Sequence, residues 1–230
     1  MIKIDAYTWQ PSAYKFFKIQ ESKHFMPAWF KEIPPSFPAP VSNGVTVDNP
    51  TMKSCPGLTD LYTKGIILPL WSDIVIQTVE DRCRFAYADN ISRLDEHDPS
   101  QMGKLRNGHV HAKLVSNWAL HTDSEVDFLW VQPSYNLNKY FRQFHVLPGI
   151  VNYKYQHGTN VNIMMEPNTR IEIPAGTPLA HIIPFTDEPI EIEHHLVTQD
   201  EYSASQPNYP SWTHSYYKEK AHDKKQENEQ

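Results

Sequence analysis

Hydrophobic and polar residues alternate over short distances in the middle of the chain. In the segment DIVIQTV, this alternation would place Ile74, Ile76 and Thr78 on one face and the residues between them on the other. A period of two residues is typical of a β-strand with one buried face. The segment therefore predicts a strand that covers a packed core.

Eight further segments have the length and the boundaries of strands. Most contain five to eight residues and are bounded by Pro, Asn, Asp or Gly: GIILPL, CRFAYA, EVDFLWVQ, FHVLPGIV, TNVNIMM, TRIEI, LAHIIPF and PIEIEHHLV. Many short strands separated by turn residues are typical of a compact antiparallel sandwich or barrel. We therefore predict an all-β domain over residues 61–197, with a jelly-roll-like barrel as one possible architecture.

Three glycines mark predicted changes of chain direction. The segment LTDLYTKG predicts one or two helical turns that end with Gly65 in a left-handed conformation. The dipeptide Pro148-Gly149 predicts one tight turn, and the segment around Gly176 predicts another. In each turn the glycine can adopt a positive φ.

The segments on either side of this domain have a different composition. Residues 1–60 form an arm rich in aromatic residues and proline, and its prolines exclude a long helix or a central strand. Trp29, Phe30 and Phe37 are expected to pack the arm onto the domain, and a partner-binding arm is the alternative. Residues 198–230 form a polar tail without an apolar stripe, which predicts a short helix that frays, or disorder, beyond Lys218.

Composition and charge narrow the range of partners. Hydrophobic residues make up 40% of the 230 residues, so a packed core is feasible. The net charge of −6 would repel a phosphate backbone, which argues against nucleic acid as a partner. Cys55 and Cys83 are too few for a disulfide framework, and no apolar run approaches the roughly 20 residues of a membrane span. These features predict a soluble protein of a reducing cytoplasm, without a membrane partner.

Two segments carry a resemblance to a known enzyme family. The sequences GIVNYKY and IPAGTPLAHIIPF are similar, in order and spacing, to two motifs of the dUTP pyrophosphatase family. In that family a G-x-I-D-x-x-Y hairpin lines the deoxyribose pocket, and a later strand closes a β-clip barrel. The resemblance aligns Asn152 with the aspartate of the hairpin and Tyr155 with its tyrosine, and it places His181 at the glutamine of the later motif. It implies a dUTPase-like β-clip fold.

The departures from this family point away from catalysis. Asn152 stands where the family has a carboxylate that activates water, and an amide cannot accept a proton near neutral pH. No Arg-Ser phosphate-binding motif is present, and no glycine follows Gly176. We therefore expect the scaffold without the hydrolase activity. If a ligand pocket remains, its expected polar residues are Asn152, Tyr155, Gln132 and His181.

The wider chain resembles an uncharacterised family that is encoded by tailed phages and some bacteria. The matching segments are PAWFK at 27–31, the Cys-Pro pair at 55–56, and residues 65–74, 132–136 and 176–185. This resemblance implies a non-catalytic structural or interaction protein of phage type, located in the host cytoplasm or in a virion. Its expected partners are other copies of the chain, as a dimer or trimer that exchanges arms, or phage or host proteins.

The histidines leave a metal-dependent enzyme open as an alternative. His109 and His111 follow Gly103 with the spacing that opens the cupin metal motif, and Pro174-Ala175-Gly176 followed by His181 approaches the second motif. The glutamate that completes the first motif is absent, because Val115 and Ser116 occupy its place.

A second metal alternative starts from His121 and Asp123. Their H-x-D spacing matches the iron-binding pair of 2-oxoglutarate oxygenases, and His181 or His194 would complete the triad. Either alternative would require iron or another divalent transition metal, whereas the favoured function requires no cofactor. The sequence thus leaves three classes open: an interaction protein, a small-molecule or nucleotide binder, and a metal-dependent enzyme.

Overall fold

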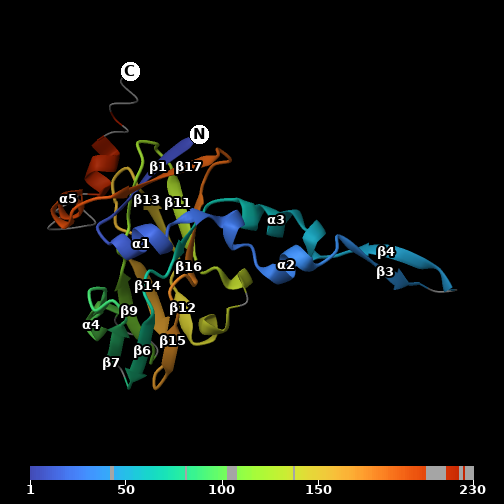
Figure 1. Cartoon of the computed structure of the whole chain (residues 1–230), viewed down its shortest axis with the longest axis horizontal. Helices are drawn as coiled ribbons and strands as arrows, with labels where there is room; N and C mark the ends of the chain where they lie inside the picture. The colour runs from blue at the N-terminus through green and yellow to red at the C-terminus, as the bar shows by residue number, and fades with distance from the viewer. Residues whose placement is uncertain are drawn as a thin grey trace.

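Strands dominate the structure, in agreement with the predicted β class. The computed structural model describes residues 1–41, 44–80, 82–102, 108–136, 138–205, 216–222 and 225. Within these residues the strands form five sheets, and none of the five closes into a barrel. Figure 1 shows four of them stacked into one elongated body, from which the fifth projects to one side.

The largest sheet brings the segments GIVNYKY and IPAGTPLAHIIPF to one central strand. Its order is β13-β11-β16-β5-β2. The strands are β13 (Gly149–Asn152), β11 (Asp127–Val131), β16 (Pro178–Pro184), β5 (Ile66–Pro69) and β2 (Gln20–Glu21). Both β13 and β16 pair antiparallel with β11. Of the two predicted glycine turns, only that at Gly176 has a positive φ, of 81°; Gly149 begins β13 without one.

A three-stranded sheet joins segments from distant parts of the sequence. Its order is β10-β1-β17, with β10 (Ala119–His121), β1 (Ile2–Thr8) and β17 (Ile190–Leu196). The pairing of β1 with β17 is parallel over seven residue pairs. Ile2, Ile4 and Ala6 of β1 are buried in the core, because they alternate with outward-facing residues. Residues 2–8, which the sequence analysis grouped with the arm, thus form a central strand.

Two sheets build the other end of the body. One has the order β12-β14-β9-β8, with β12 (Phe144–Val146), β14 (Val161–Met165), β9 (Val110–Val115) and β8 (Arg93–Glu96). The other has the order β15-β6-β7, with β15 (Arg170–Ile173), β6 (Ile74–Val79) and β7 (Arg82–Tyr87). The alternation predicted for DIVIQTV is confirmed, since Ile74, Ile76 and Thr78 are buried and alternate with more exposed residues.

Short helices connect the body to a projecting hairpin. The hairpin consists of β3 (Ser36–Pro40) and β4 (Thr46–Pro50), and it extends far from the body in Figure 1. The connecting elements are α2 (Ala28–Glu32), η3 (Met52–Ser54) and α3 (Pro56–Thr63). Phe30 is buried and its ring lies 4.8 Å from that of Tyr62, which confirms its predicted packing role. The prediction is wrong for Phe37, which is exposed on the hairpin.

The remaining helices are short. They are α1 (Pro11–Phe16), α4 (Pro99–Met102), α5 (Gln199–Ser205), η1 (Ser22–Phe25), η5 (Ser134–Asn136) and η6 (Lys139–Arg142). Residues 216–222 are also helical, and most of the tail expected to fray beyond Lys218 lies outside the described residues. Among the described helices, none is long and apolar enough to cross a membrane.

Candidate functional site

Asn152 and Tyr155 meet at the carboxylates of Glu125 and Asp127, of which Asp127 begins the neighbouring strand β11 and Glu125 lies just before it. Asn152 ends β13 and is buried, and its Nδ2 donates to Glu125 Oε1 at 3.2 Å and to Asp127 Oδ1 at 3.1 Å. The Tyr155 hydroxyl donates to Glu125 Oε2 at 2.7 Å. The structure therefore joins these two predicted residues in one site, together with two acidic residues that the sequence analysis did not select.

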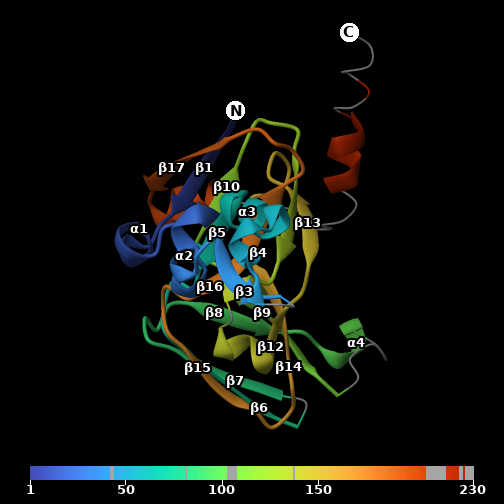
Figure 2. The ribbon, with the colours of Figure 1, turned by 90° about the vertical axis from the view of Figure 1, so that its right-hand side faces the viewer.

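Two lysines and the helical segment 216–222 complete this carboxylate network. Lys154 Nζ lies 3.5 Å from Glu125 Oε2, and Lys220 Nζ lies 2.7 Å from Asp127 Oδ1. The ring of Tyr216 packs edge-on against that of Tyr155, with centroids 6.1 Å apart. Burial alone would lower the pKa of Lys220, but its hydrogen bond to Asp127 and the nearby negative charges raise it above the ordinary value. The segment, red in Figure 2, thus covers the predicted hairpin pocket with the protein's own side chains.

The other two predicted pocket residues lie elsewhere and have structural contacts. His181 is buried in β16, where its Nε2 donates to the carbonyl of Lys64 at 2.8 Å, and burial lowers its pKa. The side-chain oxygen of Gln132 accepts from the backbone N–H of Val146 at 2.8 Å. Asn152 pairs with residue 127 of β11 and His181 with residue 131. At about 3.3 Å per residue, the two lie roughly 13 Å apart along that strand.

The H-x-D pair does form a contact. His121 Nε2 lies 3.3 Å from Asp123 Oδ1, and His121 Nδ1 lies 3.1 Å from Nε2 of His157. The proposed third ligands are engaged elsewhere: His181 donates to Lys64, and Nε2 of His194 lies 2.8 Å from the carbonyl of Ile19. The structure therefore assembles the pair without the histidines that were expected to complete a triad.

A different carboxylate–imidazole cluster lies on the outer face of the β10-β1-β17 sheet. Asp5, Glu193 and His195 each offer one ligand atom, and these three atoms lie within 4.8 Å of one another. No second such group of three occurs within the described residues. Nε2 of His195 lies 2.8 Å from Asp5 Oδ1, and Lys3 Nζ lies 2.9 Å from Glu193 Oε2. These residues could hold a divalent cation only by giving up internal ion pairs. No local sequence pattern predicts the cluster, because it depends on the parallel pairing of β1 with β17.

The two histidines of the cupin-like motif lie in another sheet. His111 faces outward from β9 and His109 immediately precedes that strand, whereas His181 belongs to the five-stranded sheet. Gly103, which opens the motif, lies outside the described residues. The motif residues are therefore divided between two sheets.

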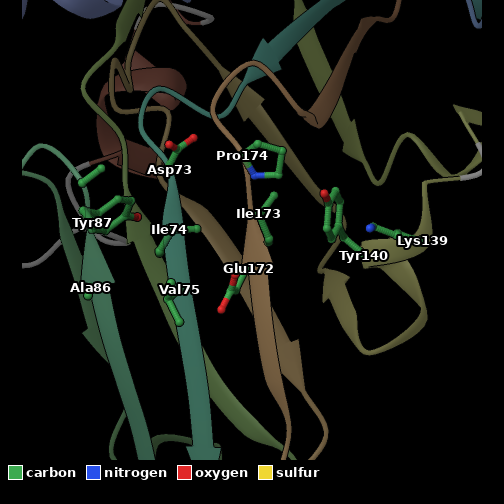
Figure 3. A pocket seen from close by; sticks show the side chains of 11 residues that line it. Asp73, Ile74, Val75, Ala86, Tyr87, Lys139, Tyr140, Glu172, Ile173 and Pro174 are labelled. Carbon is green, nitrogen blue, oxygen red and sulfur yellow. The ribbon is translucent and has the colours of Figure 1, made fainter.

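An open pocket of about 590 Å³ lies between β6, β7, β15 and η6. Figure 3 shows Asp73 and Tyr87 on one side of it and Lys139 and Tyr140 on the other, with Glu172 between them. This volume is in the range of small-molecule sites, roughly 300–1,000 Å³. The lining combines both charge signs with apolar walls, but it contains no pairing of a nucleophile with a base. It could bind a small polar molecule, and no sequence motif pointed to it.

Comparison with known proteins adds no family to this description. No protein-family model and no curated protein matches the chain.

Proposed function

We propose that this chain is a non-catalytic interaction protein that assembles with a second copy of itself through the hairpin β3–β4. The observation that carries the proposal is the apolar face of this hairpin. Register pairs Ala39 with Val47, and paired residues point to the same face. Because side chains alternate along a strand, Phe37 lies on the same face as Ala39. The backbone N–H of Val41 donates to the carbonyl of Val45, which extends this face to the turn of the hairpin.

This apolar face is exposed in the single chain. The exposed fractions are 47% for Phe37, 42% for Val41, 54% for Val45 and 40% for Val47. An isolated two-stranded hairpin is only marginally stable in water, and a contiguous exposed apolar patch commonly marks a protein interface. The only charged residue between positions 36 and 50 is Asp48. The partner surface should accordingly be apolar.

A second copy of the chain satisfies this requirement. Two identical hairpins can pack face to face around a two-fold axis, so that each apolar face covers the other in a small four-stranded sandwich. The four side chains are Phe37, Val41, Val45 and Val47, and about half of each is exposed. Burying these exposed halves in both copies contributes roughly 6–12 kcal/mol to the free energy of dimerisation. Association costs at least about 4 kcal/mol of this. The remainder corresponds to a dissociation constant of about 1 µM at best.

Sedimentation equilibrium of the full chain tests the proposal. The weight-average mass should rise from 26.7 kDa toward twice that value as the concentration increases, over a range of about 1–300 µM. Val45→Lys should abolish the rise, whereas Ile91→Lys, at a site 49% exposed outside the hairpin, should not. A mass that stays at one chain, or an equal effect of both substitutions, would refute dimerisation through the hairpin. Binding of the hairpin to phage or host proteins would then be the remaining form of an interaction function.

We also propose that the scaffold is a β-clip relative of the dUTP pyrophosphatases that does not hydrolyse nucleotides. Two features support this: β13 and β16, which carry the two motifs, flank the same strand, and Glu125 and Asp127 would repel a triphosphate beside Asn152. Thermal denaturation with dUTP and dCTP should show no shift of the midpoint. A rise of several degrees would favour the nucleotide binder instead. As a phage-type protein, the chain would act in the host cytoplasm or in a virion.

A further inference from the structure

Three histidines and a methionine form one row across the outer face of the β12-β14-β9-β8 sheet. His145 pairs with Met164, and Met164 pairs with His111. The backbone N–H of His97 donates to the carbonyl of His111 at 3.1 Å, which continues the row beyond β8. Their strand neighbours on either side, such as Ile163 and Ala112, point into the core. The four side chains therefore stand next to one another on the side away from the core.

The histidine in the middle of this row has unused hydrogen-bonding atoms. His111 is only 7% exposed, and neither of its ring nitrogens has a hydrogen-bond partner within the described residues. The Nδ1 atom of His97 is also buried without such a partner. Leaving a buried polar group unpaired costs about 1–3 kcal/mol, so the arrangement requires an explanation. The two rings lie 4.4 Å apart between centroids, which brings their nitrogen atoms into one small volume.

We propose that His97, His111 and the thioether of Met164 bind one Cu(I) ion. Two imidazoles and a thioether are soft or intermediate ligands, and this set favours Cu(I) over the hard cations that prefer oxygen. Adjacent strands are about 4.8 Å apart, so the Met164 side chain stands directly beside that of His111. No third His, Cys, Asp or Glu completes a three-ligand group with this pair in the described part of the chain, which leaves the thioether as the third ligand.

The electrostatic surroundings are compatible with a monovalent cation. The charged groups that act on His97 are Lys113 and Asp95, whose side chains pair at 3.1 Å and so offset each other. Burial lowers the pKa of both His97 and His111, with Lys113 adding to the effect at His97 and His97 adding to it at His111. Burial therefore favours the neutral imidazole, which is the form that coordinates a metal.

Competition with the Cu(I) chelator bicinchoninate tests the site on the full, untagged chain under anaerobic reducing conditions. We expect one equivalent of Cu(I) to be retained by the protein. Met164→Leu keeps the volume and the apolar character but removes the sulfur, so it should weaken the affinity at least about tenfold. His111→Gln should remove the binding. The matched control is His24→Gln, because His24 is exposed and belongs to another part of the fold.

Two further measurements keep the result decisive. Far-UV circular dichroism establishes that each variant is folded, and X-ray absorption of the copper-loaded protein should show a sulfur scatterer that Met164→Leu removes. The variant His195→Gln tests the competing cluster with Asp5 and Glu193. Three results would each overturn the proposal. The wild-type chain could fail to compete for Cu(I), or His111→Gln and Met164→Leu could both leave the affinity for Cu(I) unchanged. The third such result is a loss of affinity in His195→Gln alone.

Discussion

Asn152→Asp introduces the carboxylate that the dUTP pyrophosphatase motif has at the aligned position, and the structure predicts that it destabilises the protein. The wild-type amide donates to Glu125 and Asp127 from a side chain that is 1% exposed. A carboxylate cannot donate, so both hydrogen bonds would be lost and a third negative charge would be placed beside two others. Hydrogen bonds to charged groups contribute about 1.5–3 kcal/mol each.

The expected loss of unfolding free energy is therefore about 3–6 kcal/mol at neutral pH. That is a large part of the roughly 5–15 kcal/mol by which domains are stable. Burial and the neighbouring carboxylates raise the pKa of the introduced carboxyl in the folded state above its value in the unfolded chain. The folded state then binds the extra proton more readily, so the penalty should shrink as the pH falls and grow as the pH rises.

Urea denaturation followed by tryptophan fluorescence at about pH 5.5 and pH 8 measures both effects. Asn90→Asp is the matched control: Asn90 lies on the surface with a positive φ that aspartate also tolerates, and its change should stay within about 0.5 kcal/mol. Equal stability of Asn152→Asp and the wild-type chain at pH 8 would refute the hydrogen-bond network. Release of pyrophosphate from dUTP by the variant would show that Glu125 and Asp127 do not exclude a triphosphate from this site, contrary to the repulsion expected there.

Two further predictions concern stability. In Gly65→Ala the new Cβ would lie 2.3 Å from the carbonyl oxygen of Ile182 at a φ of +78°, whereas Gly44 has a φ of +72° with nothing within 4 Å. Gly65→Ala should thus cost several kcal/mol in urea denaturation and Gly44→Ala only about 1–2 kcal/mol, and equal losses would contradict the assigned close contact. Desolvation lowers the pKa of His181 and His194 in the folded state, so the unfolded chain binds more protons and stability should decline as the pH falls below about 6.5. His181→Gln should reduce that pH dependence, and a stability that is flat between about pH 7 and pH 5 would exclude this effect.

Local patterns were sufficient to predict many elements of this protein. The alternation in DIVIQTV identified β6 and its buried face, because a period of two is a property of the strand itself. The positive φ at Gly65 and Gly176 also followed from neighbouring residues, since turn chemistry acts over a few positions. The same signal at Gly149 was misleading, because there the segment continues as strand β13 and pairs with β11.

The sites depended on contacts that local patterns cannot specify. Asn152 was expected as a polar pocket residue, but its acidic partners were not, and neither was Lys220 from the distant tail. These partners are Glu125, just before β11, and Asp127, at its start. Parallel pairing of β1 with β17 brought Asp5 to His195 across 190 positions, and sheet register aligned His111 with Met164. Periodicity determines which face of a strand is buried, whereas the choice of neighbouring strand and its register depends on how all the apolar faces pack together. For that reason the sequence determined many of the strands and their buried faces, and only the tertiary structure decided which polar groups meet.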